Sequence, residues 1–587
     1  MILIFSRQNV YAKKIDTAER VIVIAPKVFN SSIQQWIKYR SSQGYDITLI
    51  NADDSNSPLQ IRQKISSVAL ASRLPVTAIL IVGNAVVRTE SDRGYVIPSP
   101  RLPCKIINEF ANDPHLASDD WYADFNNDNH PDCSVGRFPA NSVETLDMLI
   151  EKTIRYETEI KPDLWRRQIQ VVAGVGNFSP LIDSVIESAA HYVFMKKLPS
   201  SYETAFLYAN WKSVFCPSPI DIRNEYTATL NRSPMFWIYI GHGYHRSLQS
   251  LSTPHGQIRT LGDSNYSEKQ QENHNDAFPT LSCKNSLPIV MLLCCYGGVL
   301  DAKTKSTAEE LFLQKNGAAA IIATSRASMP YGLTVFGTEC LDEFISRQNK
   351  PEKILLGSII FETKKRMLTT LYDKETTTKS NQLNFTEQKI FRQNITNIAK
   401  WLDPFPTKLD LQLEEHVEQI HLFGDPLLVI QQLIPIKLDV PQKIKSGSKI
   451  KIKGEIQTEF LNQVNQHNLI KKHNQNINNN KYNFTDINVL IDLAISSEQI
   501  SFRSDRREKI ARCDISTRQA DNDEYQLANQ HIIARYIVPV SSDGIFETEI
   551  PSTKIPSTKN LYGKHIIRVF CKLPEAAAAG SANINLW

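Results

Sequence analysis

Six short apolar runs, separated by stretches of helical character, constrain the fold of this 587-residue chain more than any other feature. None of them alternates apolar with polar residues, as a half-exposed strand does. Continuous apolar strands are typical of a parallel sheet covered on both faces. The predicted strands are RVIVIAP (20–26), TAILIVG (77–83), IQVVAGVG (169–176), MFWIYIGHG (235–243), PIVMLLCC (288–295) and AAAIIATS (318–325). Alternation of strand and helix predicts an α/β fold.

Helical spacing appears at 143–157 and 306–316. Ser306 or Thr307 is placed to cap the second helix, and Gly317 to end it. The character changes after about residue 434, where apolar and polar residues alternate with a period of two. This pattern predicts a small antiparallel Ig-like β-sandwich following the α/β region.

The length of the chain predicts two to four domains. We expect boundaries that give an N-terminal α/β subdomain at 1–160, a second α/β subdomain at 161–433 and the β-sandwich at 434–587. Within the sandwich, 462–483 is rich in Asn, Gln, Lys and His. Such a composition does not bury a core, so we expect a disordered excursion from one loop.

Composition excludes several classes of function. A net charge of +4 is small for this length and gives no reason to expect nucleic acid as a partner. No run reaches the roughly 18 apolar residues that span a bilayer. The apolar run at the start of the sequence is too short for the hydrophobic core of a secretory signal. We therefore expect a cytoplasmic location, with a secreted protein whose export signal is missing from this chain as the alternative.

Nine cysteines are scattered along the chain without a C-x-x-C pair. This spacing indicates neither a disulfide framework nor a zinc site, so free thiols are expected.

Two of the predicted strands end in reactive residues, His242 in GHG and Cys295 in CCYGG. Ligands bind beyond the carboxyl ends of parallel strands, so the two side chains share one crevice if their strands are neighbours. A cysteine peptidase needs this pair, because an imidazole activates the thiol. Gly241 and Gly243 allow close approach of a substrate. The amides of Gly243 and Cys295 are placed to bind an oxyanion.

Other interpretations of these residues stay open. A histidine after a strand is often structural, and a cysteine there is often a small buried hydrophobe. His242 and His245 are alternatively shared metal ligands, and Cys294 with Cys295 a vicinal disulfide. Because neighbours in a strand alternate faces, Cys294 is expected to point into the core and Cys295 toward the crevice.

Several ordered motifs resemble the gingipain-type cysteine peptidases, of the clan of caspases, legumain and clostripain. They are LIVGNA (80–85), SDDWYADFNNDNHPDCSVGRFPANSVETLDMLIEKTIRYE (118–157), IYIGHG, PIVMLLCCYGGVLD and HLFGDPLLVI (421–430). The resemblance covers about 20–430. It implies a caspase-like sheet flanked by helices, a catalytic subdomain at 161–433, and an Ig-like domain after it.

The resemblance also implies roles for single residues. His242 matches the general base and Cys295 the nucleophile, with a protein or peptide as substrate and no organic cofactor required. Leu300 stands where the family often has Phe. The family's orienting acid falls near Gly176 or Asn177, neither of them acidic, so a dyad is expected.

Asp183 resembles the acid that gives arginine-specific gingipains their basic P1 preference. The alternative is that Asp183 caps a helix over 183–195. The specificity hypothesis predicts faster cleavage after Arg or Lys than after Asp.

An acidic loop carries oxygen ligands at positions 1, 3, 5 and 9 of a calcium-loop spacing, which are Asp124, Asn126, Asp128 and Asp132. Asn129 replaces the usual glycine and Val135 the bidentate glutamate. The spacing therefore indicates a partial structural calcium site, with a solvated polar turn as the alternative.

Two rival functions accompany the peptidase hypothesis. The first is that the chain is an inactive relative of this fold that serves for binding or scaffolding. The missing acid favours this rival, and the presence of both reactive residues opposes it. Alternatively, the β-sandwich is the functional part, as a partner-binding module. The polar segment 261–285 is expected to border the substrate groove or to be a processing site.

Overall fold

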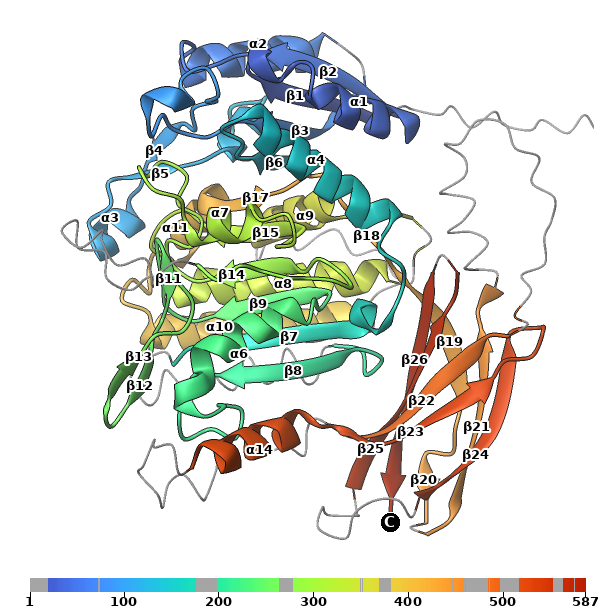
Figure 1. The fold of residues 1–587 in the computed structure, drawn as a ribbon. Coiled ribbons are helices and arrows are strands. Elements are labelled where there is room, and N and C mark those ends of the chain that lie inside the picture. Colours follow the sequence, from blue (N-terminus) through green and yellow to red (C-terminus); the bar gives the residue numbers. More distant parts are fainter. Residues whose placement is uncertain are drawn as a thin grey trace, which may run out of the picture.

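The computed structural model is described for most of the chain (Figure 1). The described residues are 19–71, 74–175, 198–262, 278–348, 350, 352–368, 382–445, 447–458, 460, 484, 486–496, 517–552, 563–574 and 576–587.

Ten strands of the described chain form one large sheet. They are β1 (Glu19–Ala25), β2 (Tyr45–Asn51), β3 (Val76–Val82), β6 (Ser134–Phe138), β7 (Gln168–Ala173), β8 (Glu203–Tyr208), β9 (Phe236–Ile240), β14 (Ile289–Leu293), β15 (Ala320–Thr324) and β17 (Ile420–Phe423). The order is β2-β1-β3-β6-β17-β15-β14-β9-β7-β8. All neighbours are parallel except β15 and β17. The predicted α/β class is confirmed, and each of the six predicted strands is present.

Both faces of this sheet are buried, which explains the continuous apolar runs. In β1, Val21 and Val23 share a hydrophobic core with Trp36, whereas Ile22 shares a second core with Ile61. Trp36 belongs to α1 and Ile61 to α2, so helices cover opposite faces of the same strand. The helices of this half are α1 (Ile33–Ser42), α2 (Pro58–Leu70), α3 (Ile106–Ala111) and α4 (Val143–Thr158).

Further helices cover the other half of the sheet (Figure 1). They are α6 (Ile222–Asn231), α7 (Thr307–Phe312), α8 (Pro330–Arg347), α9 (Leu356–Leu368), α10 (Gln382–Leu402) and α11 (Leu409–Gln419). Of the helices described, none combines the length and apolar character that crossing a membrane requires.

Helix α7 begins as predicted but ends early. Ser306 caps it and forms a reciprocal capping box with Glu309. The predicted helix extends to 316, whereas the observed one ends at Phe312. There the buried Lys152 ammonium donates hydrogen bonds to the carbonyls of Phe312 and Gln314, and the Gln314 carbonyl also accepts one from Gly317 N at 3.0 Å.

Short two-stranded pairs lie outside the large sheet. They are β4 (Arg101–Pro103) with β5 (His115–Ala117), β10 (Gly243–Tyr244) with β11 (Ser247–Leu248), β12 (Leu251–Thr253) with β13 (Gly256–Ile258), and β16 (Ile354–Leu355) with β18 (Val429–Ile430).

The C-terminal region forms a second sheet with its own core, beside the large sheet (Figure 1). Its strands are β19 (Leu433–Asp439), β20 (Lys443–Ile444), β21 (Lys449–Ile456), β22 (Asn488–Ile495), β23 (Ile532–Pro539), β24 (Ile545–Pro551), β25 (Gly563–Lys572) and β26 (Ala577–Leu586). The order is β23-β22-β25-β26-β19-β21-β24, and β20 also pairs with β26.

Most of these strands pair antiparallel, as predicted, but β26 pairs in parallel with β19 and β20. Strand β19 contacts β26 through its first residues and β21 through its last, so it joins both layers of the sandwich. The excursion predicted at 462–483 lies outside the described residues.

A helix of the C-terminal region, α14 (Arg518–Asn529), reaches back to the edge strand β8 of the large sheet (Figure 1). The Asn529 side chain accepts a hydrogen bond from Phe206 N at 2.7 Å and donates one to Phe206 O at 2.9 Å. Arg518 forms an ion pair with Asp221. The sandwich prediction did not include this helix, which covers an otherwise open sheet edge.

Candidate active site

His242 and Cys295 follow neighbouring strands at the same level. Strands β9 and β14 are paired in parallel, with Ile240 opposite Leu293. His242 and Cys295 each come two residues after this last pair. The two residues therefore lie at one carboxyl edge of the sheet, the condition that the sequence left open.

The glycine after His242 packs directly against the cysteine pair. A Cβ atom added to Gly243 would lie 2.4 Å from Cys294 Sγ and 2.6 Å from Cys295 O, so only glycine fits there. Gly241 has φ +156°, and a Cβ there would meet Gly174 N at 3.0 Å. The GHG turn thus sits against both flanking strand ends. The oxyanion roles of the Gly243 and Cys295 amides stay predictions.

The two adjacent cysteines differ in burial as expected. Cys294 is fully buried in the core, Cys295 is half-buried, and both are free thiols. Cys294 and Cys295, which are both described, therefore form no vicinal disulfide. Cys295 Sγ accepts a hydrogen bond from Ser328 N at 3.2 Å. Burial raises the pKa of the Cys295 thiol, and the Ser328 N–H opposes that rise by stabilising the thiolate.

The two histidines of the GHGYH segment have different surroundings. The His242 carbonyl accepts hydrogen bonds from Gln249 N at 3.1 Å and from the Tyr239 hydroxyl at 2.7 Å, which fixes the backbone of the turn. His245 Nε2 lies 3.1 Å from Thr304 O. Burial lowers the pKa of His245 to about 4. His245 therefore braces the loop before α7 as a neutral ring.

Three predicted features lie outside the described residues. Asp183, the candidate for P1 recognition, falls there with its predicted helix. So do Gly176 and Asn177, the positions that match the family's orienting acid. Most of the polar segment 261–285 is also outside. The roles predicted for them stay predictions.

The acidic loop forms its own network of hydrogen bonds. Asn126 Nδ2 donates to Asp128 Oδ2 at 3.1 Å and to Asp132 Oδ1 at 3.2 Å. Asp124 Oδ2 forms an ion pair with Arg62 at 2.8 Å. Across the described residues, no three His, Cys, Asp or Glu side chains gather in a group suited to hold a metal ion. The calcium site stays a prediction that rests on ligand spacing.

Two other acids of the same motif have structural roles. Asp119 forms a bidentate ion pair with Arg137, at 2.6 and 2.7 Å, and both side chains are buried. Asp120 pairs with the buried Lys364. Burial alone would raise the pKa of Asp119, but Arg137 holds it below its usual value. Asp119 thus joins its segment to β6 and Asp120 joins it to α9, so neither acid is free to act on a substrate.

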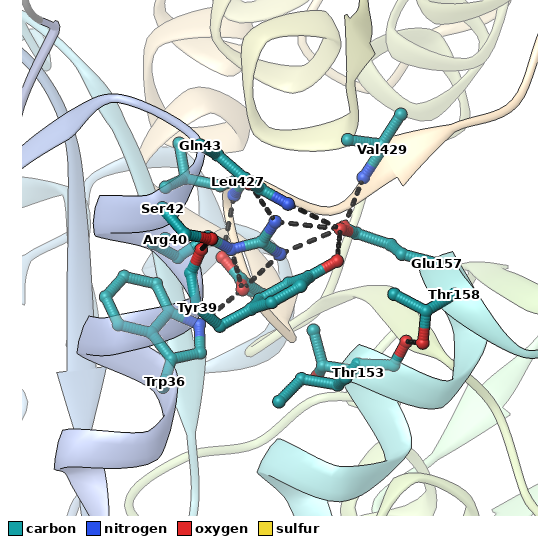
Figure 2. Close-up of polar contacts among 12 residues, drawn as sticks. Trp36, Tyr39, Arg40, Ser42, Gln43, Thr153, Glu157, Thr158, Leu427 and Val429 are labelled. Atoms are coloured by element: carbon teal, nitrogen blue, oxygen red, sulfur yellow. Dashed lines mark hydrogen bonds and ion pairs between the residues drawn. The ribbon is translucent and has the colours of Figure 1, made fainter. Parts of the chain in front are cut away.

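A third pair of motif acids, Glu157 and Asp425, also has a structural role (Figure 2). The motifs gave no sign of the arginine that lies between them. Arg40 of α1 donates to both Glu157 carboxylate oxygens at 2.9 Å and to Asp425 Oδ2 at 2.7 Å. Glu157 belongs to the YE motif and Asp425 to GDP-x-L. The Arg40 side chain is completely buried, so the three charges bind distant segments together. Only the spacing of Trp36 and Arg40 on α1 hinted at a buried arginine.

The comparisons agree with the resemblance seen in the sequence. Gingipain R2 of Porphyromonas gingivalis (strain ATCC BAA-308 / W83) is 24% identical over 251 residues, which are 42% of this chain and 30% of that protein. Gingipain R1 of Porphyromonas gingivalis has the same identity over 251 residues, 42% of this chain and 23% of its own length. The chain thus spans less than a third of these relatives.

The crystal structure of the Arg-specific cysteine proteinase gingipain R (RGPB) matches 97% of this chain and 98% of its own, at 14% identity and a TM-score of 0.48. A family model gives the assignment, since the model described as peptidase family C25 matches residues 14–431, well over half of the chain. The protein therefore belongs to peptidase family C25, the gingipain-type cysteine peptidases.

Proposed function

We propose that this chain is a cysteine endopeptidase with Cys295 as nucleophile and His242 as general base. The observation that supports this most is the alignment of the two residues, each two positions beyond a directly paired strand end. Family membership supports the same chemistry. The half-buried Cys295 and the tightly packed GHG turn fit a site where thiol and imidazole work together.

The proposed reaction follows from these groups. His242 takes the Cys295 proton as the sulfur attacks the scissile carbonyl carbon, and the carbonyl π electrons move to oxygen. The amides of Gly243 and Cys295 donate hydrogen bonds to that oxyanion. His242 then protonates the leaving amine as the C–N bond breaks. Water, deprotonated by His242, attacks the thioester and releases the acid and the free thiol.

A raised thiol pKa makes the base necessary. Burial raises the pKa of the Cys295 thiol and so favours the protonated sulfur in the resting protein. A cysteine with a low pKa attacks without help, whereas this one needs a proton acceptor at hand. The hydrogen bond from Ser328 N to Cys295 Sγ partly offsets this effect of burial on the thiol pKa.

Specificity for Arg or Lys at P1 is part of the proposal, through Asp183. The crystal structure matched above is that of a protein described as Arg specific. A fluorogenic panel that varies only P1 tests this idea. Faster hydrolysis after Arg and Lys than after Asp, lost in Asp183→Ala, supports it, and equal rates contradict it.

We also propose that the loop with Asp124, Asn126, Asp128 and Asp132 takes Ca²⁺ as a structural ion. The shared hydrogen bonds bring three of these side chains together. Arg62 already compensates the charge of Asp124, so the expected affinity is weak. A cytoplasmic location stays a prediction.

Hydrolysis of a peptide library by wild type, Cys295→Ala and His242→Ala tests the activity. Activity in wild type that both variants lose supports the dyad. Equal activity in wild type and Cys295→Ala contradicts it. Absence of activity in all three, with a folded wild type, favours the inactive scaffold.

A further inference from the structure

The residue after Cys295 has an unusual backbone. Tyr296 has φ +56°, in the left-handed region that large side chains rarely adopt. Two glycines follow it in CCYGG, and either would take this conformation without strain. The strain falls instead on a tyrosine in contact with the proposed nucleophile. Strain of this kind persists only where surrounding contacts hold it.

Contacts from two sides hold Tyr296. Its hydroxyl donates a hydrogen bond to Asp113 Oδ2 at 2.6 Å, and its backbone N–H donates to Arg326 O at 3.1 Å. The ring packs with Cys295 against a small apolar cluster that includes Cys104 and Leu116. Burial, and then Asp113, raise the pKa of the Tyr296 phenol, so it remains a donor at neutral pH.

The acceptor is itself anchored. Arg326 donates to His115 O at 2.8 Å, two residues from Asp113, and its guanidinium pairs with Asp301 at 2.8 Å. The preceding helix α3 is fixed at its first turn, because the Glu415 carboxylate accepts hydrogen bonds from the N–H groups of Ile106 and Ile107 at 3.0 Å. Asp113 therefore presents its carboxylate from a firmly held loop.

The conformation of Tyr296 sets the peptide plane that it shares with Cys295. The oxygen of that plane, Cys295 O, lies against Gly243, and the sulfur lies against Ser328 N. Rotation at Tyr296 would move Cys295 relative to both. We propose that the Asp113–Tyr296 hydrogen bond is a positioning device that holds Cys295 in its attacking orientation. This rests on the proposed function of Cys295.

Full-length Tyr296→Phe and Asp113→Ala each remove the hydrogen bond, and Asp113→Asn keeps an acceptor. Tyr202→Phe is the matched control, because its buried hydroxyl has no hydrogen-bond partner in the described structure. The readouts are kcat and KM on the best library peptide, Tm, and the iodoacetamide labelling rate of Cys295 at pH 8, followed by peptide mapping.

We expect kcat to fall about tenfold in Tyr296→Phe and Asp113→Ala, as for a misplaced catalytic group, with KM within about twofold. Labelling should slow roughly fivefold, since a displaced sulfur loses the Ser328 N–H. Asp113→Asn and Tyr202→Phe should match wild type. Unchanged kcat and labelling in both test variants overturn the proposal, as does an equal loss in Tyr202→Phe.

If wild type itself hydrolyses nothing, the proposed function fails and the labelling arm still decides this inference. Slower labelling in Tyr296→Phe and Asp113→Ala, with Tm and Tyr202→Phe unchanged, supports positioning of Cys295. Equal labelling in all variants overturns it.

Discussion

Two regions of the molecule carry family motifs, and they use them differently. Around Arg40, every charge is buried and paired, and the carboxylates accept further hydrogen bonds from Leu427 N and Val429 N (Figure 2). At the edge with His242 and Cys295, side chains are half-buried, and within the described residues the hydrogen bonds of the Cys295 sulfur are with the Ser328 N–H and the Ser328 carbonyl. The first region has no capacity left for chemistry, whereas the second does.

The difference teaches how to interpret a motif of charged residues. The acids in SDDW, YE and GDP-x-L look as reactive in the sequence as GHG and CCYGG. Their partners decide the matter, because a buried and fully paired carboxylate stabilises the fold and a partly exposed thiol at a strand end is available to a substrate.

The largest expected effect is a loss of activity without a loss of stability, at the edge that carries Cys295. Cys295→Ala should lower kcat/KM on peptides by more than about 10³-fold, because the proposed nucleophile is lost. Its Tm should remain close to that of wild type. Cys133→Ala, which removes a free thiol buried elsewhere in the molecule, is the control and should keep activity. A fully active Cys295→Ala would break the comparison.

Removal of the central arginine tests the other region. Arg40→Met leaves Glu157 and Asp425 buried without their partner, and the free energy of unfolding should fall by about 3–5 kcal/mol. Urea denaturation measures the change, and the folded fraction should retain its kcat. Lys408→Met, at the solvent-exposed pair with Glu109, should cost less than about 1 kcal/mol. Similar losses in both variants would contradict a special role for Arg40.

Acid should weaken the paired region first. Burial alone would raise the pKa of Glu157, but Arg40 and Tyr39 hold it below its usual value. A lowered folded-state pKa gives stability that is complete above the unfolded value of about 4.3 and is lost as pH falls through the folded value. The free energy of unfolding, measured with urea from pH 6 down to pH 3, should therefore fall as the pH falls.

Glu157→Gln serves as the comparison for that profile. It should be less stable at pH 6 and should show a shallower decline toward pH 3, because the titrating group is gone. A decline as steep as that of wild type would assign the acid sensitivity to other carboxylates, such as Asp119.

The smallest expected effect concerns calcium. Addition of Ca²⁺ after chelation should raise Tm by a few degrees at most, since Arg62 already neutralises Asp124. Asp128→Ala should abolish the increase. An identical Tm with calcium and with chelator would leave the loop as a hydrogen-bonded polar turn.

The apolar runs predicted six strands of the large sheet but not β6 and β17 in its middle, nor the edge strands β2 and β8. Strands β1, β3, β7, β9, β14 and β15 are continuous apolar runs because both of their faces are buried. Edge strands β2 and β8 have only one neighbour and mixed burial, so their residues give a weaker pattern. Helix α14 buries little beyond Tyr525 and docks through polar groups, which leaves no apolar stripe to recognise.

The candidate site likewise has features that the sequence predicted and features that only the tertiary structure decided. The sequence alone determined the α/β class and the family, and it singled out His242 and Cys295 as the candidate pair, because strand periodicity and short motifs are local properties of the chain. Tertiary structure decided that their strands pair in register, that Arg40 joins Glu157 to Asp425, and that Asp113 holds Tyr296. These contacts join residues from about fifty to nearly four hundred positions apart, and only the packing of the sheet brings them within a hydrogen bond's reach.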